Sequence, residues 1–367
     1  GPSGGGGRMG GGGSSAGQAG QGGGAGAVQG GTTGAATGGT AGAGVAGSGG
    51  TNGGGRGGGA GGQSGTGGTT APDAAETKPD AAPIVDLAPE TAPATNCAAI
   101  PKGQLTTRRI PGIEPLEDVT FDDAGNIYWA KASGGIFKTT VDGKTTQLVP
   151  RVEVFGGMRM APDGNLYAIV DFNLEVIAPN GTRARVISGL ELNGLEVDPK
   201  GRAYVSNFAG TEVLRFDPVT KNIATLTKGI INVPNGLTFN RAFDLLYVNT
   251  WDGDRNKTIF QIPVTPEGTA GGPATTFASG VGGGTFDGMG VDECGNVYLA
   301  DSAGVGEILR FAPDGKSHEV LIRRRGETLH NFVWGRGKGW SETKLYIVSL
   351  EEGLFEAELG VRSKKYW

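Results

Sequence analysis

Large apolar side chains are absent from the first 83 of the 367 residues, which contain no Leu, Ile, Phe, Tyr or Trp. Of the 72 glycines, 36 fall within the first 70 residues. Such a stretch cannot bury enough apolar surface to offset the entropy of ordering its backbone. We therefore predict a disordered tether over residues 1–96, rich in Gly, Ser, Thr and Ala and then in Pro, Ala and acidic residues, and one folded domain over 97–367.

A basic excess and a long apolar run are absent too. The net charge of −5 argues against a nucleic-acid partner, which needs a basic face. No apolar run approaches the roughly 20 residues of a membrane span. The tether resembles the spacers of bacterial surface lipoproteins, and the start at Gly1 looks processed. We expect an extracytoplasmic monomer, secreted or tethered to a bacterial cell surface, whose partner is a small-molecule substrate or ligand.

Cysteine is scarce, with only Cys97 and Cys294 in the chain. Two unpaired buried thiols are one interpretation of this pair. In an extracytoplasmic protein the alternative is a disulfide. Such a bond would join the entering chain to the body of the domain.

A sixfold repeat is what the sequence does contain. Its first positions are spaced 39, 37, 42, 52 and 43 residues apart, and the segments are 117–122, 156–161, 193–198, 235–240, 287–292 and 330–335. Most segments precede a turn and then a β-rich run with a central Tyr. Turns between alternating apolar runs at this period predict four-stranded blades, so the fold class is all-β, a six-bladed β-propeller. A seven-bladed ring would need a repeat that the sequence does not supply.

The last repeat ends after its third strand, over residues 354–359. The run 104–110, just before blade one, is the expected donor of the missing outer strand. Closing the ring in this way pairs both ends of the chain and removes an exposed sheet edge.

The first position of each repeat should point at the central channel, because the innermost strand of every blade lines it. We call this set the axial ring: Glu117, Gly156, Asn193, Asn235, Asp287 and His330. Asn-Gly and Asp-Gly are common turn dipeptides, so a single match means little. Two carboxylates and two carboxamides at the same position of the repeat instead favour a binding site for a hard cation. Ca²⁺ is the first candidate, with Mg²⁺, Mn²⁺ or Zn²⁺ as alternatives.

These segments resemble the family of six-bladed propellers that unites senescence marker protein, gluconolactonase and luciferin-regenerating enzyme, and the related calcium-dependent phosphotriesterase-like propellers. The runs 234–237 and 287–292 match most closely. In that family a Glu in blade one, an Asn in blades three and four and an Asp in blade five hold a divalent cation. The resemblance implies that role for four residues here: Glu117, Asn193, Asn235 and Asp287.

The substrate-binding positions of that family are not matched. Its sugar-lactone members often have an Arg where this chain has Glu191, and an Asp where this chain has Lys131. The first motif also reads Glu117-Asp118-Val119 instead of Glu-Gly-Pro. The resemblance therefore implies the metal site more strongly than a gluconolactone substrate.

His330 is interpreted either as a structural histidine of the channel wall or as a base or proton shuttle beside the metal. Loops after the second strands should form the rim of the channel and contact the substrate, with 251–257 as a partial lid. Together with Glu191, the expected rim residues are Lys131, Phe172, Asn173, Asn207, Phe208, Trp251, Asp252, Ser302 and Glu351.

Two functions remain open. The first is a divalent-metal-dependent hydrolase of lactones or related small esters, with Asp287 as candidate base or nucleophile and His330 assisting. The second is a non-catalytic surface propeller whose metal is structural, since a fold does not imply a function. A strictosidine-synthase-like protein is a weaker third, because it would not require the four ligands.

Overall fold

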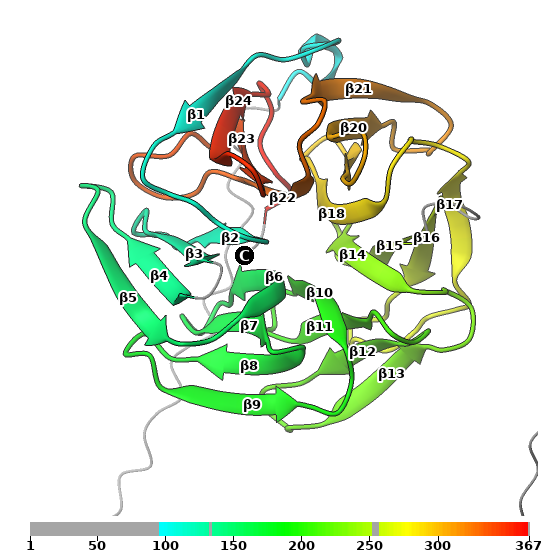
Figure 1. The fold of residues 1–367 in the computed structure, drawn as a ribbon. Coiled ribbons are helices and arrows are strands. Elements are labelled where there is room, and N and C mark those ends of the chain that lie inside the picture. Colours follow the sequence, from blue (N-terminus) through cyan, green and yellow to red (C-terminus); the bar gives the residue numbers. More distant parts are fainter. Residues whose placement is uncertain (1–94, 132–133, 252–256, 366–367) are drawn as a thin grey trace, which may run out of the picture. The chain divides into compact units, whose positions relative to one another are not determined.

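The computed structural model describes residues 95–131, 134–251 and 257–365. Nearly all of the predicted tether over 1–96 lies outside these residues. The described residues form six four-stranded antiparallel sheets arranged around a central axis (Figure 1). The predicted six-bladed β-propeller is confirmed. None of the described helices is long and apolar enough to span a membrane.

Each blade runs outward from the axis in chain order. Blades one to three are β2 (Val119–Phe121), β3 (Ile127–Lys131), β4 (Gly135–Thr139), β5 (Thr145–Pro150); β6 (Val154–Met160), β7 (Leu166–Val170), β8 (Asn173–Ile177), β9 (Arg183–Ile187); β10 (Leu192–Val197), β11 (Ala203–Asn207), β12 (Val213–Phe216) and β13 (Ile223–Thr227). Blades four to six are β14 (Pro234–Phe239), β15 (Leu245–Thr250), β16 (Thr258–Pro263), β17 (Thr275–Ser279); β18 (Phe286–Val291), β19 (Val297–Asp301), β20 (Glu307–Phe311), β21 (His318–Arg323); β22 (Leu329–Trp334), β23 (Lys344–Ser349) and β24 (Gly353–Glu358).

A carboxylate closes the turn between the first and second strands in three blades. Asp292 accepts hydrogen bonds from the Asn296 backbone N–H at 2.9 Å and from the Tyr298 hydroxyl at 2.8 Å. Asp122 binds Tyr128, and Asp198 binds Tyr204, in the same way. In these three blades the Tyr hydroxyl satisfies the turn carboxylate while the ring is buried among apolar side chains.

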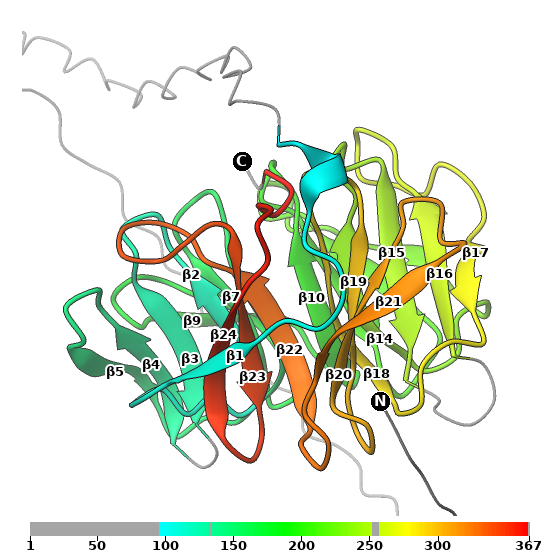
Figure 2. The same ribbon diagram turned by 90° about the horizontal axis from the view of Figure 1, so that it is seen from above.

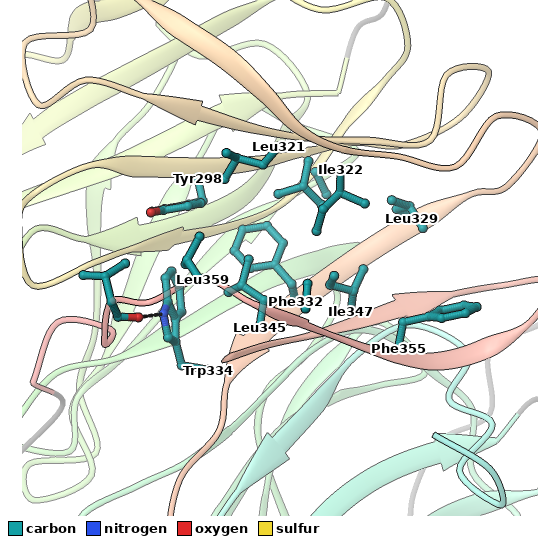
Figure 3. Packing of buried hydrophobic residues seen from close by; sticks show 14 of the residues in the cluster. Tyr298, Leu321, Ile322, Leu329, Phe332, Trp334, Leu345, Ile347, Phe355 and Leu359 are labelled. Atoms are coloured by element: carbon teal, nitrogen blue, oxygen red, sulfur yellow. Dashed lines mark hydrogen bonds between the residues drawn. The ribbon is translucent and has the colours of Figure 1, made fainter. Parts of the chain in front are cut away.

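The hydrophobic core consists of clusters between neighbouring blades. Between blades five and six, Tyr298 packs edge-on against Trp334, with ring centroids 5.2 Å apart, and Phe332 is buried beside them (Figure 3). Apolar residues cover both faces of each sheet, so the inner three strands of the blades read as nearly continuous apolar runs.

The outer strand of blade six comes from the N-terminal side of the domain, as predicted. Strand β1 (Thr107–Ile110) pairs antiparallel with β24, with Thr107 opposite Ala357. The predicted strand began at residue 104, but Leu105 donates its N–H to the Leu321 carbonyl at 2.7 Å. Residues 104–106 therefore cross from blade five to blade six before the strand begins.

Both ends of the described chain also meet at the blade-five turn. The 3₁₀ helix η1 (Cys97–Ala99) carries the cysteine that is disulfide-bonded to Cys294, with Cα atoms 5.7 Å apart. Glu293 donates its N–H to the Arg362 carbonyl at 3.0 Å. The predicted disulfide is confirmed and the interpretation as two free thiols was wrong. Figure 2 shows η1 and the C-terminal tail on one face of the ring.

Candidate metal centre

Five of the six axial ring residues lie on the first strands of their blades, and Glu117 lies in the bend just before β2. In blades two to six the pairing of the first and second strands shifts register at the axial ring, between Val154 and Met158, Leu192 and Leu195, Pro234 and Leu237, Phe286 and Met289, and Leu329 and Phe332. Such bulges re-aim side chains and are frequent beside functional sites. The Asn-Gly and Asp-Gly pairs of the axial ring therefore lie within strands, at 193–194, 235–236 and 287–288.

The glycine that follows the ring residue allows neighbouring inner strands to approach closely. A Cβ atom on Gly236 would lie 2.0 Å from the Asp287 carbonyl oxygen, and one on Gly194 would lie 2.2 Å from that of Asn235. Both distances are too short for any side chain. Glycine at this position thus lets each candidate ligand pack directly against the next blade.

Two carboxylates and one imidazole meet at the axis. The Nδ1 atom of His330 lies 3.0 Å from Oδ2 of Asp287 and 3.1 Å from Oε2 of Glu117. The potential ligand atoms of these residues all lie within 4.8 Å of one another. The three side chains are only 9–16% exposed. Sequence reasoning placed them on one ring, and the structure brings them into direct contact.

The two candidate asparagine ligands differ in their surroundings. Asn235 donates its Nδ2 to the Phe286 carbonyl at 2.9 Å and lies 3.3 Å from Asp287 Oδ1. Its own Oδ1 is buried without a hydrogen-bond partner. Asn193 donates to the Phe155 carbonyl and lines the same small cavity as Glu117 and Asp287. A buried, unpaired amide oxygen beside two carboxylates fits an oxygen-preferring cation.

The pKa values of Glu117 and His330 are shifted because these groups are buried close to other charged groups of the axial ring. Burial raises the pKa of Glu117 to about 8, and the nearby Asp287 carboxylate adds to this effect. Burial would lower the pKa of His330, but its hydrogen bond to Asp287 and the charges of Asp287 and Glu117 raise it to about 9. Without a metal, the His330 imidazolium supplies the positive charge that the two carboxylates require.

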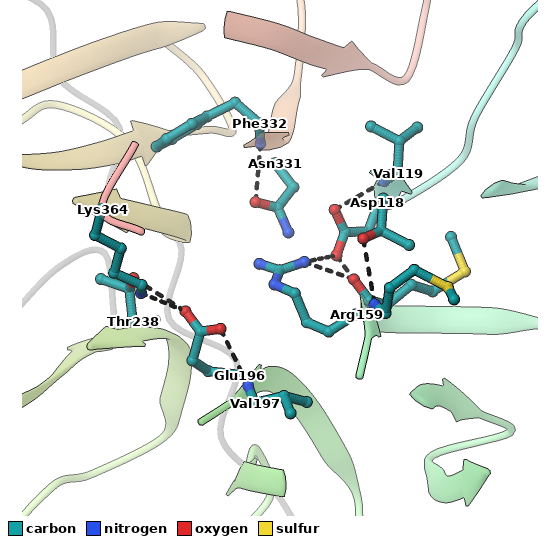
Figure 4. Close-up of polar contacts among 12 residues, drawn as sticks. Asp118, Val119, Arg159, Glu196, Val197, Thr238, Asn331, Phe332 and Lys364 are labelled. Atoms are coloured by element: carbon teal, nitrogen blue, oxygen red, sulfur yellow. Dashed lines mark hydrogen bonds and ion pairs between the residues drawn. The ribbon is translucent and has the colours of Figure 1, made fainter. Parts of the chain in front are cut away.

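A second polar layer, not predicted from the sequence, lies next to the axial ring (Figure 4). Asp118 accepts from Nη1 of Arg159 at 2.6 Å, and Glu196 accepts from Nζ of Lys364 at 2.7 Å. Arg159 and Glu196 occupy the fourth position of the repeat. Because the bulge breaks the two-residue alternation of a strand, this position also faces the channel. A search of the sequence for polar residues at the fourth position of the repeat could have found Arg159 and Glu196.

Comparison with known proteins places these observations in a family. The sequence profile of the SMP-30/gluconolactonase/LRE-like region matches residues 117–350. The chain belongs to this family. No curated protein gives a significant sequence match.

Solved structures of the family share the fold at low sequence identity. A putative gluconolactonase is 19% identical with a TM-score of 0.58, covering 73% of this chain and 97% of its own. A gluconolactonase from Xanthomonas campestris is 18% identical with a TM-score of 0.54, covering 67% and 88%. A calcium-binding protein, regucalcin, from Agrobacterium tumefaciens is 18% identical with a TM-score of 0.56, covering 71% and 95%. At these identities the likeness establishes the fold alone.

The charged rim residues lie outside the axial ring, and the charge of Glu351 helps to raise the pKa of His330. Glu191 is exposed. Lys131 is also exposed and forms an ion pair with Glu114 at 3.3 Å, a residue that sequence reasoning missed. Glu351 accepts from the backbone N–H of Thr328 at 2.7 Å. Asp252 and most of the expected lid lie outside the described residues.

The uncharged rim residues fall into two groups. Asn207 and Ser302 are buried, Asn207 donates to Glu212 at 2.8 Å, and Asn173 donates to backbone carbonyls of its own hairpin. The aromatic residues form pairs: Phe172 stacks on Phe155, and Phe208 packs edge-on against Trp251. Phe155 was missed because no motif distinguishes it from a core phenylalanine.

Proposed function

We propose that this protein is a divalent-metal-dependent hydrolase of lactones or related small esters, with Ca²⁺ as the preferred ion and Mg²⁺, Mn²⁺ or Zn²⁺ as alternatives. One observation carries the proposal. The carboxylates of Glu117 and Asp287 converge on the axis beside the buried, unpaired Oδ1 of Asn235. The ligand atoms of Glu117 and Asp287 lie within 4.8 Å of one another, and a bound cation would balance the charge of two carboxylates so close together.

Glu117, Asn193, Asn235 and Asp287 would hold the ion. When bound, such an ion polarises a carbonyl oxygen and lowers the pKa of water. Asp287 can in addition accept a proton through a carboxylate oxygen. Because His330 Nδ1 lies 3.0 Å from Oδ2 of Asp287, the imidazole can orient this carboxylate and take up the proton that it accepts.

The proposal is tested with a panel of lactones, aryl esters and phosphotriesters, measured with chelator and after Ca²⁺ is returned. Activity should disappear when the chelator is added and recover when Ca²⁺ is returned. Asp287→Asn retains an oxygen ligand but removes the base, so turnover should fall by roughly 10²-fold or more while calorimetry still detects the ion. Asp163→Asn, in an exposed turn, serves as the matched control.

His330→Gln separates the two roles of the histidine. A modest loss of turnover with an unshifted pH profile indicates an orienting residue, and a large loss with a shifted profile indicates a proton carrier. If the metal-loaded wild type hydrolyses no member of the panel, the hydrolase proposal fails and a non-catalytic binding propeller replaces it.

We also propose that the protein acts outside the cytoplasm. The Cys97–Cys294 disulfide supports this location, since such bonds persist in oxidising compartments. Thiol labelling of the native protein, taken directly from the producing cells, should modify neither cysteine before reduction. Full labelling without reductant would contradict the proposal.

A further inference from the structure

One backbone contact recurs around the mouth of the channel. In blades three to six the residue that follows the second strand donates its N–H to the residue two before the axial ring position: Phe208 to Glu191, Trp251 to Val233, Ser302 to Thr285 and Leu350 to Thr328, at 2.7–3.0 Å. The side chain after the second strand is therefore held at an equivalent place in each blade, one hydrogen-bonded step outside the ring. Its identity decides what the mouth presents to a substrate.

Phe208 and Trp251 occupy this position in blades three and four, and in blade two Phe172 lies one residue further along, after Asp171. Phe172 stacks on Phe155 with ring centroids 5.2 Å apart, and Phe208 packs against Trp251 at 5.6 Å. We call these four residues the aromatic wall. The segment 191–193, which ends on the candidate ligand Asn193, contacts three of them. Leu192 donates to the Phe172 carbonyl, Asn193 donates to that of Phe155, and Glu191 accepts from Phe208.

Phe172 is kept on the surface against its conformational preference. Asp171 and Phe172 form the two-residue loop between β7 and β8, with φ values of 47° and 62°. Asn-Gly is the usual pair in such a loop, because an aromatic residue in the left-handed region is disfavoured. Yet the Phe172 side chain is 39% exposed. An exposed apolar ring in a strained turn beside a candidate site points to a function.

The other side of the mouth carries charged side chains. Between blades six and one a cavity of about 340 Å³ is lined by Arg109, Glu114, Lys131, Glu351 and Glu352, together with the apolar Leu116 and Leu350. An apolar group entering the channel would have to desolvate these charges on that side. The aromatic wall is thus the favourable contact surface for such a group.

We infer that the substrate carries an aromatic or similarly flat apolar group, which packs on the aromatic wall while its carbonyl end reaches the axial ring. This inference rests on the proposed hydrolase function for its reaction, but the binding surface itself does not depend on turnover. Polyhydroxylated sugar lactones do not fit this wall, because their hydroxyl groups would lose water without gaining hydrogen bonds.

The first experiment compares two lactones that differ by a fused benzene ring, dihydrocoumarin and δ-valerolactone, in the metal-loaded protein. Phe172→Gly should lower the ratio of their kcat/KM values by roughly tenfold, because it removes one face of the aromatic contact. Thermal unfolding checks that the variant remains folded, because the change relieves the positive φ of the turn but also removes the ring that stacks on Phe155. Using the ratio cancels the different intrinsic reactivities of the two lactones.

Phe243→Gly is the matched control. Phe243 is also a phenylalanine with positive φ, at 58°, but it lies in the turn between β14 and β15, on the face opposite the mouth, and packs on Phe239. Its substitution should change stability and leave the ratio unchanged. An unchanged ratio in Phe172→Gly and in Trp251→Ala would overturn the inference.

A second experiment is independent of catalysis. It measures by calorimetry the binding of the non-hydrolysable lactam counterparts, 3,4-dihydroquinolin-2-one and δ-valerolactam. The quinolinone should bind more tightly, and Trp251→Ala should remove the difference. If the wild type hydrolyses nothing yet prefers the quinolinone, the proposed function fails and the inference stands. Equal binding of the two lactams, or binding of neither, overturns it.

Discussion

The side chain of Asn249 fixes a candidate ligand through its backbone. Asn249 lies in β15, is fully buried, and donates its Nδ2 to the Asp287 carbonyl at 2.5 Å. The missing Cβ of Gly236 leaves the space for this contact. In blade three the Ser206 hydroxyl plays the matching part by accepting from the Gly194 N–H. Residues of this kind do not bind the metal themselves, but they orient the residues that do.

We therefore expect Asn249→Leu, which has about the same volume but no hydrogen bonds, to weaken Ca²⁺ binding roughly tenfold or more. Calorimetry measures the affinity, and thermal unfolding checks that the variant remains folded. Asn165→Ala, in an exposed turn, is the control and should bind as the wild type does. Unchanged affinity in Asn249→Leu would show that the Asp287 backbone is held without this amide.

At the scale of elements, the C-terminal tail closes the channel on the face opposite the mouth. After β24 the chain crosses to blade five, where Lys364 donates its backbone N–H to the Val291 carbonyl. Its ammonium is fully buried and donates to Glu196 at 2.7 Å, to Thr238 at 2.7 Å and to the Phe239 carbonyl at 3.0 Å. The tail thus adds a second closure of the ring, in addition to the pairing of β1 with β24.

Lys364→Met should destabilise the domain by about 3–5 kcal/mol, because it leaves the Glu196 carboxylate buried without its cation. The double variant Lys364→Met with Glu196→Met should regain most of that loss, since both charges are then absent. Urea unfolding followed by tryptophan fluorescence measures the free energies. A double variant as unstable as the single one would indicate that packing, and not charge, explains the effect.

The same pair predicts a dependence on pH. Burial raises the pKa of Glu196, but the Lys364 ammonium, with Arg159 and hydrogen bonds, outweighs burial and leaves it below its usual value. In the wild type this contribution is present at neutral pH and is lost as the pH falls through the lowered pKa. In Lys364→Met burial dominates and the pKa rises, so the deficit should be smaller at pH 4 than at pH 8. A deficit independent of pH would contradict this account.

At the scale of the whole molecule, the disulfide connects residues 197 positions apart in the chain. Replacing both Cys97 and Cys294 by Ser should lower the free energy of unfolding by about 2–4 kcal/mol, because the unfolded chain regains conformational freedom. The ring should remain closed through β1 and β24, and Ca²⁺ affinity should not change, since the bond lies on the face opposite the mouth. Identical urea midpoints for the oxidised and reduced wild type would refute the stabilising role.

The blade number, the closing strand and the axial ring could be predicted because each follows from the position of residues within the sequence repeat. Strands alternate with a fixed period and turns carry recognisable residues, so Glu117, Asn193, Asn235 and Asp287 align without knowledge of their distances. The two cysteines left both free thiols and a disulfide open, and the structure decides for the disulfide. The position of each strand within its repeat depends on local preferences, which is why it could be predicted.

The partners of Lys364, the orientation of Arg159 and the pairing of Phe155 with Phe172 were decided by the tertiary structure alone. Lys364 meets Glu196 across 168 residues, and no property of the tail sequence names that partner. The bulge at the axial ring turned Arg159 towards the channel, against simple alternation. Likewise Phe155 and Phe172 are ordinary phenylalanines until the folding of blade two places the β7–β8 loop against β6. The local sequence determines where each strand begins and which of its residues are apolar. Which side chains touch depends on how six sheets pack around one axis, because the packing energy comes from contacts between residues that are far apart in the chain.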